Sequence, residues 1–164
     1  MKNQTIRSWT ATAALTALLS LTLFLTPALS HHSFAMYDQT KTVTLTGVAT
    51  QFVAQANHAE IHFYAVGPDG KLMKDAAGKN VSWGVEMAGA AAVAQQGITA
   101  ATFGAGTVFS VRLNPLRDGS NYGSRIGAIA KCPTDSATGK PQIPAAGKHC
   151  DSVPGNTLLG GNAF

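Results

Sequence analysis

Histidines are the residues with the clearest capacity for chemistry in this sequence. His31 and His32 are adjacent near the start of the chain, and His58 and His62 flank Glu60 in a short alternating segment. Neutral imidazoles are common ligands of transition metals, and nitrogen-rich sites favour Cu(II) by ligand type and by the Irving–Williams order. Whether these side chains act together depends on how the chain is processed and folded.

The first residues have the composition of a secretory leader. Lys2 and Arg7 form a short positive segment, and the uncharged run 11–25 is rich in Ala, Leu and Thr before it breaks at Pro27. A helix needs roughly 20 apolar residues to cross a bilayer, so this run is too short for a comfortable span but suits a signal-peptide core. An uncut membrane anchor is the alternative interpretation.

A cleavage site follows the apolar run directly. Ala28 and Ser30 occupy the third and first positions before His31, which matches the small-x-small pattern of signal peptidase sites. We predict that residues 1–30 are removed and that the protein reaches the periplasm or the extracellular space. No lipidation cysteine follows the leader, so we expect no membrane insertion after processing.

Cleavage at this site would make His31 the first residue. Its free amine and its imidazole can then chelate one ion together, an arrangement called a histidine brace when another histidine completes it. His32, His58 and His62 are the candidates for that further ligand. The alternative is that these histidines are solvated and that Phe34 simply packs on the domain.

His58 and His62 form a second candidate metal cluster. They share one face of a predicted strand with Glu60 between them, and Glu86 is a third candidate ligand. The same spacing arises on any solvated strand face, and a carboxylate such as Glu86 can instead accept a hydrogen bond from a loop. Both interpretations stay open from sequence.

Cys132 and Cys150 are the only cysteines, and they lie in a segment rich in Pro, Gly and Lys. In an oxidising compartment we predict that they form a disulfide, which would stabilise the fold by about 3 kcal/mol. A thiolate metal site is the alternative, but the chain has no CxxC motif to support it. Residues 132–164 lack a period and are predicted to be a Gly/Pro-rich loop pinned by that disulfide.

Arg117 lies in the run Pro115 to Gly119, whose residue types favour a turn. Its guanidinium could contact a ligand through two parallel hydrogen bonds. We interpret Arg117 as a turn residue first and as a possible ligand contact second.

Hydrophobic periodicity predicts a mainly β domain over residues 31–131. The predicted strands cover residues 42–53, 58–66, 81–87, 107–113 and 124–131, and a short alanine-rich helix covers 90–96 and ends at Gly97. A change of apolar phase at Gly47 predicts a bulge there. The order β-β-β-α-β-β is that of an OB-like five-stranded Greek-key barrel, with a small open sandwich as the alternative.

Size and charge limit the classes of function. Removing 30 of the 164 residues leaves 134, which is the size of one domain. Lys2 and Arg7 would leave with the leader, so ten Lys and Arg remain against eight Asp and Glu. No basic cluster remains to neutralise a row of phosphates, and we expect no nucleic-acid partner.

The sequence resembles a family of small secreted bacterial proteins of unknown function whose mature chains begin His-His-Ser-Phe. The family usually has Asn-Pro-His-Ala-Trp where this chain has Ala56-Asn57-His58-Ala59-Glu60, and its chains end sooner. The resemblance implies secretion and an OB-like domain, and it implies no activity. The positions that carry it are residues 31–34, residues 43–47, Asn57 with His58, Trp83 with Glu86, Gly97, Gly106 and residues 115–119.

Two functions of different classes follow. One is a periplasmic copper-binding protein for storage, transfer or protection, and the other is a non-catalytic module that binds a small ligand, a peptide or an envelope protein. An enzyme is the third choice, with Tyr37 or Tyr64 as an axial group for copper. The chain has no Ser-His-Asp order, phosphate-binding glycine loop or dinucleotide motif to support catalysis.

Overall fold

The computed structural model describes residues 34–161, so the predicted signal peptide, His31 and His32 lie outside the described residues. Within 34–161 no helix is long and apolar enough to cross a bilayer. The elements in chain order are the 3-10 turn η1 (Phe34–Met36), β1 (Val43–Ala54), β2 (Ala59–Val66), β3 (Ser82–Glu86), the helix α2 (Ala90–Ala94), β4 (Val108–Pro115), β5 (Tyr122–Lys131), the 3-10 turn η2 (Cys150–Ser152) and β6 (Thr157–Leu159).

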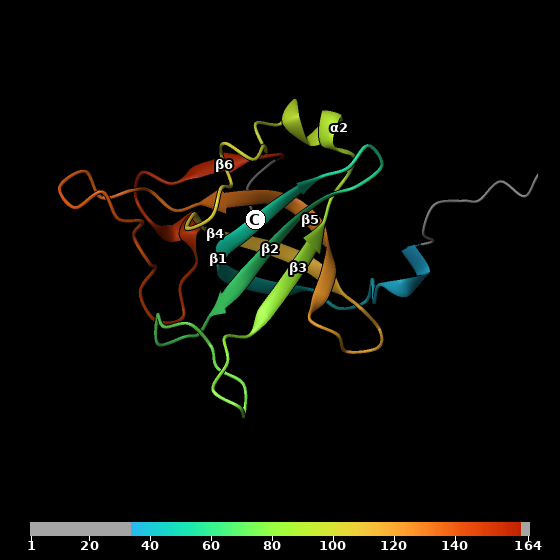
Figure 1. Ribbon diagram of the computed structural model, residues 1–164, viewed down its shortest axis with the longest axis horizontal. Coiled ribbons are helices and arrows are strands. Elements are labelled where there is room, and N and C mark those ends of the chain that lie inside the picture. Colours follow the sequence, from blue (N-terminus) through green and yellow to red (C-terminus); the bar gives the residue numbers. More distant parts are fainter. Residues whose placement is uncertain (1–33, 162–164) are drawn as a thin grey trace, which may run out of the picture. The chain divides into compact units, whose positions relative to one another are not determined.

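Five of the strands close into a barrel (Figure 1). β1 pairs antiparallel with β2 and with β4, and the remaining antiparallel pairs are β2–β3 and β4–β5. A parallel pairing of β3 with β5, in which Gly84 lies opposite Tyr122, completes the closure. Within the described residues, the short helix α2 lies between β3 and β4 in the chain. The predicted OB-like barrel and its element order are therefore confirmed.

Alternation along β2 separates the core from the outer surface. Ala59, Ile61, Phe63 and Ala65 are fully buried inside the barrel, because successive side chains of a strand point to opposite faces. Phe63 and Phe103 each make an edge-to-face contact with Phe109, with ring centroids 5.1 and 5.5 Å apart. The outer face of β2 is left to Glu60, His62 and Tyr64, which are all half-buried.

The predicted bulge at Gly47 is wrong. The register of β1 against β2 shifts between Ala49 and Gln51 instead. Gly47 lies opposite Ala65 in regular pairing, and a Cβ atom at this position would overlap the Phe63 ring. Gly47 interrupts the apolar pattern because a larger residue would collide with the core residue Phe63. The strand pairing stays regular at Gly47.

The C-terminal segment is tied to the barrel. The predicted disulfide between Cys132 and Cys150 is confirmed, and both cysteines are buried. Part of the segment is not loop, because β6 pairs antiparallel with β5 through Ile129 and Leu159. This strand has three residues and gains its hydrogen bonds from a distant partner, so local periodicity carries no signal for it.

Candidate functional site

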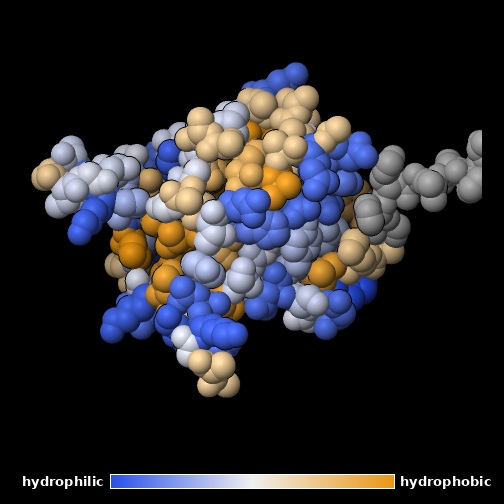
Figure 2. All heavy atoms as spheres, viewed as in Figure 1, coloured by the Kyte–Doolittle hydropathy of each residue, from blue (hydrophilic) through white to orange (hydrophobic). Residues whose placement is uncertain are grey.

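Glu60 and Glu86 lie opposite each other on the outer face of β2 and β3. Side chains directly opposite in an antiparallel pair have Cβ atoms about 4.5–5.5 Å apart, and two like charges there destabilise the sheet. Figure 2 shows hydrophilic residues over the region of these strands. The two carboxylates therefore need positive or hydrogen-donating neighbours.

His58 supplies one such neighbour for Glu86. It precedes β2 by one residue, and its Nδ1 lies 3.4 Å from Oε1 of Glu86. The other ring nitrogen, Nε2, is shielded from solvent although the side chain as a whole is 28% exposed. A carboxylate beside one imidazole nitrogen fixes the ring orientation and the tautomer, as such carboxylates do for histidines that bind metals.

His62 contacts the other carboxylate. Its Nε2 lies 3.0 Å from Oε2 of Glu60, so the two imidazoles are drawn to different glutamates. Among residues 34–161 no three His, Cys, Asp or Glu side chains lie together in a way that could hold a metal ion. His58, His62 and Glu86 do not make a complete ligand set by themselves, and His31 and His32 lie outside the described residues.

Tyr37 lies beneath Glu86 as a third neighbour. Its side chain is only 1% exposed, and its hydroxyl faces the carboxylate without reaching a hydrogen bond of regular geometry. Burial and the negative charge of Glu86 raise the pKa of the Tyr37 phenol above its ordinary value. Tyr37 therefore stays a neutral group with a proton available to the carboxylate.

Tyr122 occupies the equivalent place beside Glu60. Its ring covers Gly84, where a Cβ atom would overlap the ring and would come within 3.5 Å of Nδ1 of His62. Burial and the nearby Glu60 carboxylate raise the pKa of the Tyr122 phenol. The sequence interpretation missed Tyr122; the available signal was Gly84, since a glycine inside a strand often marks the close approach of another group.

Arg117 is a turn residue that holds the segment before Tyr37. Its Nε donates to the carbonyl oxygen of Ala35 at 3.0 Å, and its backbone N–H donates to Met36 at the same distance. Its guanidinium also lies 3.9 Å from the Asp38 carboxylate. These contacts fix the backbone from which Tyr37 reaches Glu86. Ligand contact by Arg117 stays an untested prediction.

The alternative in which Phe34 packs on the barrel does not agree with its exposure. The Phe34 side chain is 67% exposed, and Met36 is 41% exposed. Tyr37 is the first described residue that is buried, and it bridges to Leu116.

Comparison with known proteins identifies the family of the chain but indicates no activity. Residues 18–125 match the profile of a family of unknown function (DUF6152). No curated protein and no solved structure shows significant similarity to the chain.

Proposed function

The chain belongs to the DUF6152 family, whose function is unknown, so we infer a function from the residues of this chain. We propose that it is a secreted copper-binding protein. The proposed ligands are the amine and imidazole of His31, made available by cleavage before that residue, and the imidazole of His58. Three nitrogen donors of this kind favour Cu(II) over the other divalent ions of the first transition row.

The observation that carries this proposal is the contact between His58 and Glu86. With Nδ1 at 3.4 Å from the carboxylate, the imidazole is held in one orientation beside Glu86. Histidines that bind metals commonly have such a carboxylate partner, which holds the ring in one orientation. In this proposal Glu86 positions the ligand and is not itself bound to the ion.

The proposal requires the N-terminus to reach His58. Tyr37 lies near Glu86 and comes six residues after His31. Six extended residues span at most about 20 Å. His32 and His62 are alternative ligands, and the experiment below tests His62.

Secretion supports the same function. The leader residues 1–30 predict export, and the Cys132–Cys150 disulfide is of the kind that persists in oxidising compartments. Export is also what creates the free amine at His31. A single ion held by nitrogen ligands suits storage, transfer or protection from copper, and no partner beyond the ion is needed.

The test uses the mature protein, beginning at His31, in a Cu(II) titration against a chelator of known affinity. We expect one tight site. An alanine added before His31 removes the amine from the chelate and should weaken binding by orders of magnitude. His58→Ala should weaken it by about 100-fold or more, since loss of a residue that merely supports a ligand costs about 10- to 100-fold.

His62→Ala is the matched control, because it removes an imidazole that also pairs with a glutamate on the same sheet. We expect its copper affinity to stay within about twofold of the wild type, which is below 0.5 kcal/mol. Unchanged affinity after the N-terminal extension would overturn the brace. A large loss in His62→Ala with none in His58→Ala would move the site to the other histidine.

A further inference from the structure

A cavity on another side of the barrel lies between the sheet and the C-terminal segment. It has a volume of about 300 Å³, at the lower end of the range for small-molecule sites. The start of β1, the end of β2 and the loop before the disulfide line it, and Figure 2 shows apolar residues gathering where these segments meet. None of its lining residues belongs to the proposed copper site.

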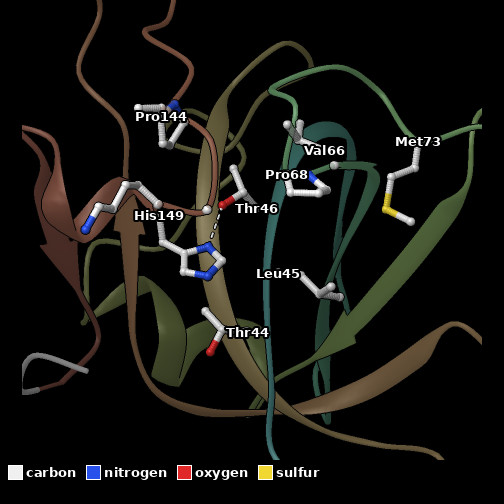
Figure 3. Close-up of a pocket in the computed structure, with 12 residues that line it drawn as sticks. Thr44, Leu45, Thr46, Val66, Pro68, Met73, Pro144 and His149 are labelled. Atoms are coloured by element: carbon white, nitrogen blue, oxygen red, sulfur yellow. Dashed lines mark hydrogen bonds between the residues drawn. The ribbon is translucent and has the colours of Figure 1, made fainter.

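His149 provides the polar end of this cavity (Figure 3). Its imidazole points inward from the C-terminal loop, with Nδ1 toward Thr46 and the opposite ring edge toward Thr44 and Leu45. The distance from Nδ1 to the Thr46 hydroxyl is 2.8 Å. His149 is next to Cys150 in the chain, so the disulfide anchors the loop that presents it.

A buried chain of hydrogen bonds fixes the tautomer of His149. The backbone N–H of Cys150 can only donate, and it donates to Oγ of Ser110 at 2.8 Å. The fully buried Ser110 hydroxyl must then donate to Thr46, 2.7 Å away, since a buried hydroxyl proton needs an acceptor. Thr46 in turn donates to Nδ1 of His149. Neutral His149 therefore carries its proton on Nε2, which faces the cavity as a donor.

The remaining lining sets the chemistry of a suitable ligand. Leu45, Val66 and Met73 provide an apolar wall. The ionisable side chains that line the cavity are His149 and the exposed Lys148, and no Asp or Glu is among them. A protonated Nε2 has no lone pair for a metal, so the cavity suits an acceptor with negative charge and an apolar body.

We propose that this cavity is a binding site for a small aliphatic or aromatic carboxylate. One carboxylate oxygen accepts a hydrogen bond from Nε2 of His149, Lys148 attracts the anion at the rim, and the hydrocarbon part lies against Leu45 and Val66. This site is independent of the proposed copper site, because it shares no residue with it.

Nuclear magnetic resonance of the mature protein, titrated with hexanoate and hexanamide in the presence of a metal chelator, tests the proposal. In the free protein the ring nitrogens of His149 should show the Nε2–H tautomer. Hexanoate should bind at one saturable site and shift the methyl signals of Leu45 and Val66. Hexanamide should bind about fivefold more weakly, since hydrogen bonds to charged groups exceed neutral ones by roughly 1 kcal/mol.

Lys148→Ala and Lys140→Ala form a matched pair of exposed lysines in the same segment, and only the first lines the cavity. Lys148→Ala should weaken hexanoate several-fold and leave hexanamide unchanged, whereas Lys140→Ala should alter neither. His149→Leu should reduce the preference for the carboxylate to the part that Lys148 contributes, and His149→Gln, which keeps a donor, should retain more of it. An Nδ1–H tautomer, or hexanoate shifts that avoid the cavity, would overturn the proposal.

Discussion

Glu60 and Glu86 lie opposite each other on β2 and β3, yet each carboxylate is within ion-pair distance of a different histidine. Two tyrosines complete the arrangement: the buried Tyr37 lies beside Glu86 and the half-buried Tyr122 lies beside Glu60. The outer face thus holds two similar groups of one carboxylate, one imidazole and one phenol. Only the group with His58 contains a proposed copper ligand, so the two groups should respond differently to mutation.

Glu86→Gln should lower the Cu(II) affinity of the mature protein by about 10- to 100-fold, as found when a carboxylate that orients a metal-binding histidine is removed. Gln keeps the shape of the side chain but loses the charge that supports His58. Glu60→Gln is the control, and a chelator competition should show little change in it. Equal losses in both variants would mean that the charge of the face matters and the orientation of His58 does not.

Tyr37 and Tyr122 should ionise only at a pH well above that of an ordinary tyrosine. Burial and the glutamates raise the pKa of both phenols, so the folded state favours their neutral form. This stabilisation is complete below the ordinary tyrosine pKa of about 10 and is lost as the pH rises beyond it. Absorbance at 295 nm should show ionisation of Tyr37 and Tyr122 only as the protein unfolds in alkali. Tyr122→Phe should remove part of the absorbance change that accompanies unfolding. If the titration curve is the same as that of the wild type, Tyr122 does not ionise in that step, which would contradict its raised pKa.

Asp38 should stabilise the start of the domain in a pH-dependent way. Hydrogen bonds from Thr40, together with Lys41, lower the pKa of the Asp38 carboxyl to about 2. The stabilisation is therefore present above pH 4 and is lost as the pH falls toward 2. Thermal melting should show Asp38→Asn below the wild type at pH 6, with the gap closing by pH 2. A gap of constant size would show that the charge of Asp38 has no role.

Gly47→Ala should destabilise the barrel, because the added Cβ would overlap the Phe63 ring in the core. Overpacking of this kind costs about 1–3 kcal/mol. Gly78→Ala is the comparison, since a Cβ there meets nothing within 4 Å and only the positive φ of 76° opposes it. Urea denaturation should give the larger loss for Gly47→Ala. A smaller loss than in Gly78→Ala would indicate that β1 shifts to release the ring.

Much of the fold could be predicted from sequence because it depends on local alternation. The buried face of β2 follows from every second residue between Ala59 and Ala65, and the positive φ of Gly97 agrees with the predicted helix stop. The position of the bulge and the strand β6 could not be predicted. Both depend on contacts between distant segments, Gly47 with Phe63 and β6 with β5, that a single sequence does not reveal.

The site was only partly predictable for the same reason. Alternation places Glu60 and His62 on one outer face, and spacing alone suggests that His58 joins them. The structure instead pairs His58 with Glu86 across β2 and β3, a contact that depends on strand register. The roles of Tyr122 and of the cavity at His149 depend on barrel closure and on the disulfide, which bring together residues far apart in the chain.

Native mass spectrometry of the exported protein, with and without Cu(II), tests the central claim most directly. One spectrum reports the first residue, the state of the Cys132–Cys150 disulfide and the number of bound ions. We expect a chain that begins at His31, contains the disulfide and holds one copper ion in the presence of a mild chelator. A chain that begins elsewhere, or that takes up copper loosely and in variable number, would contradict the proposed site.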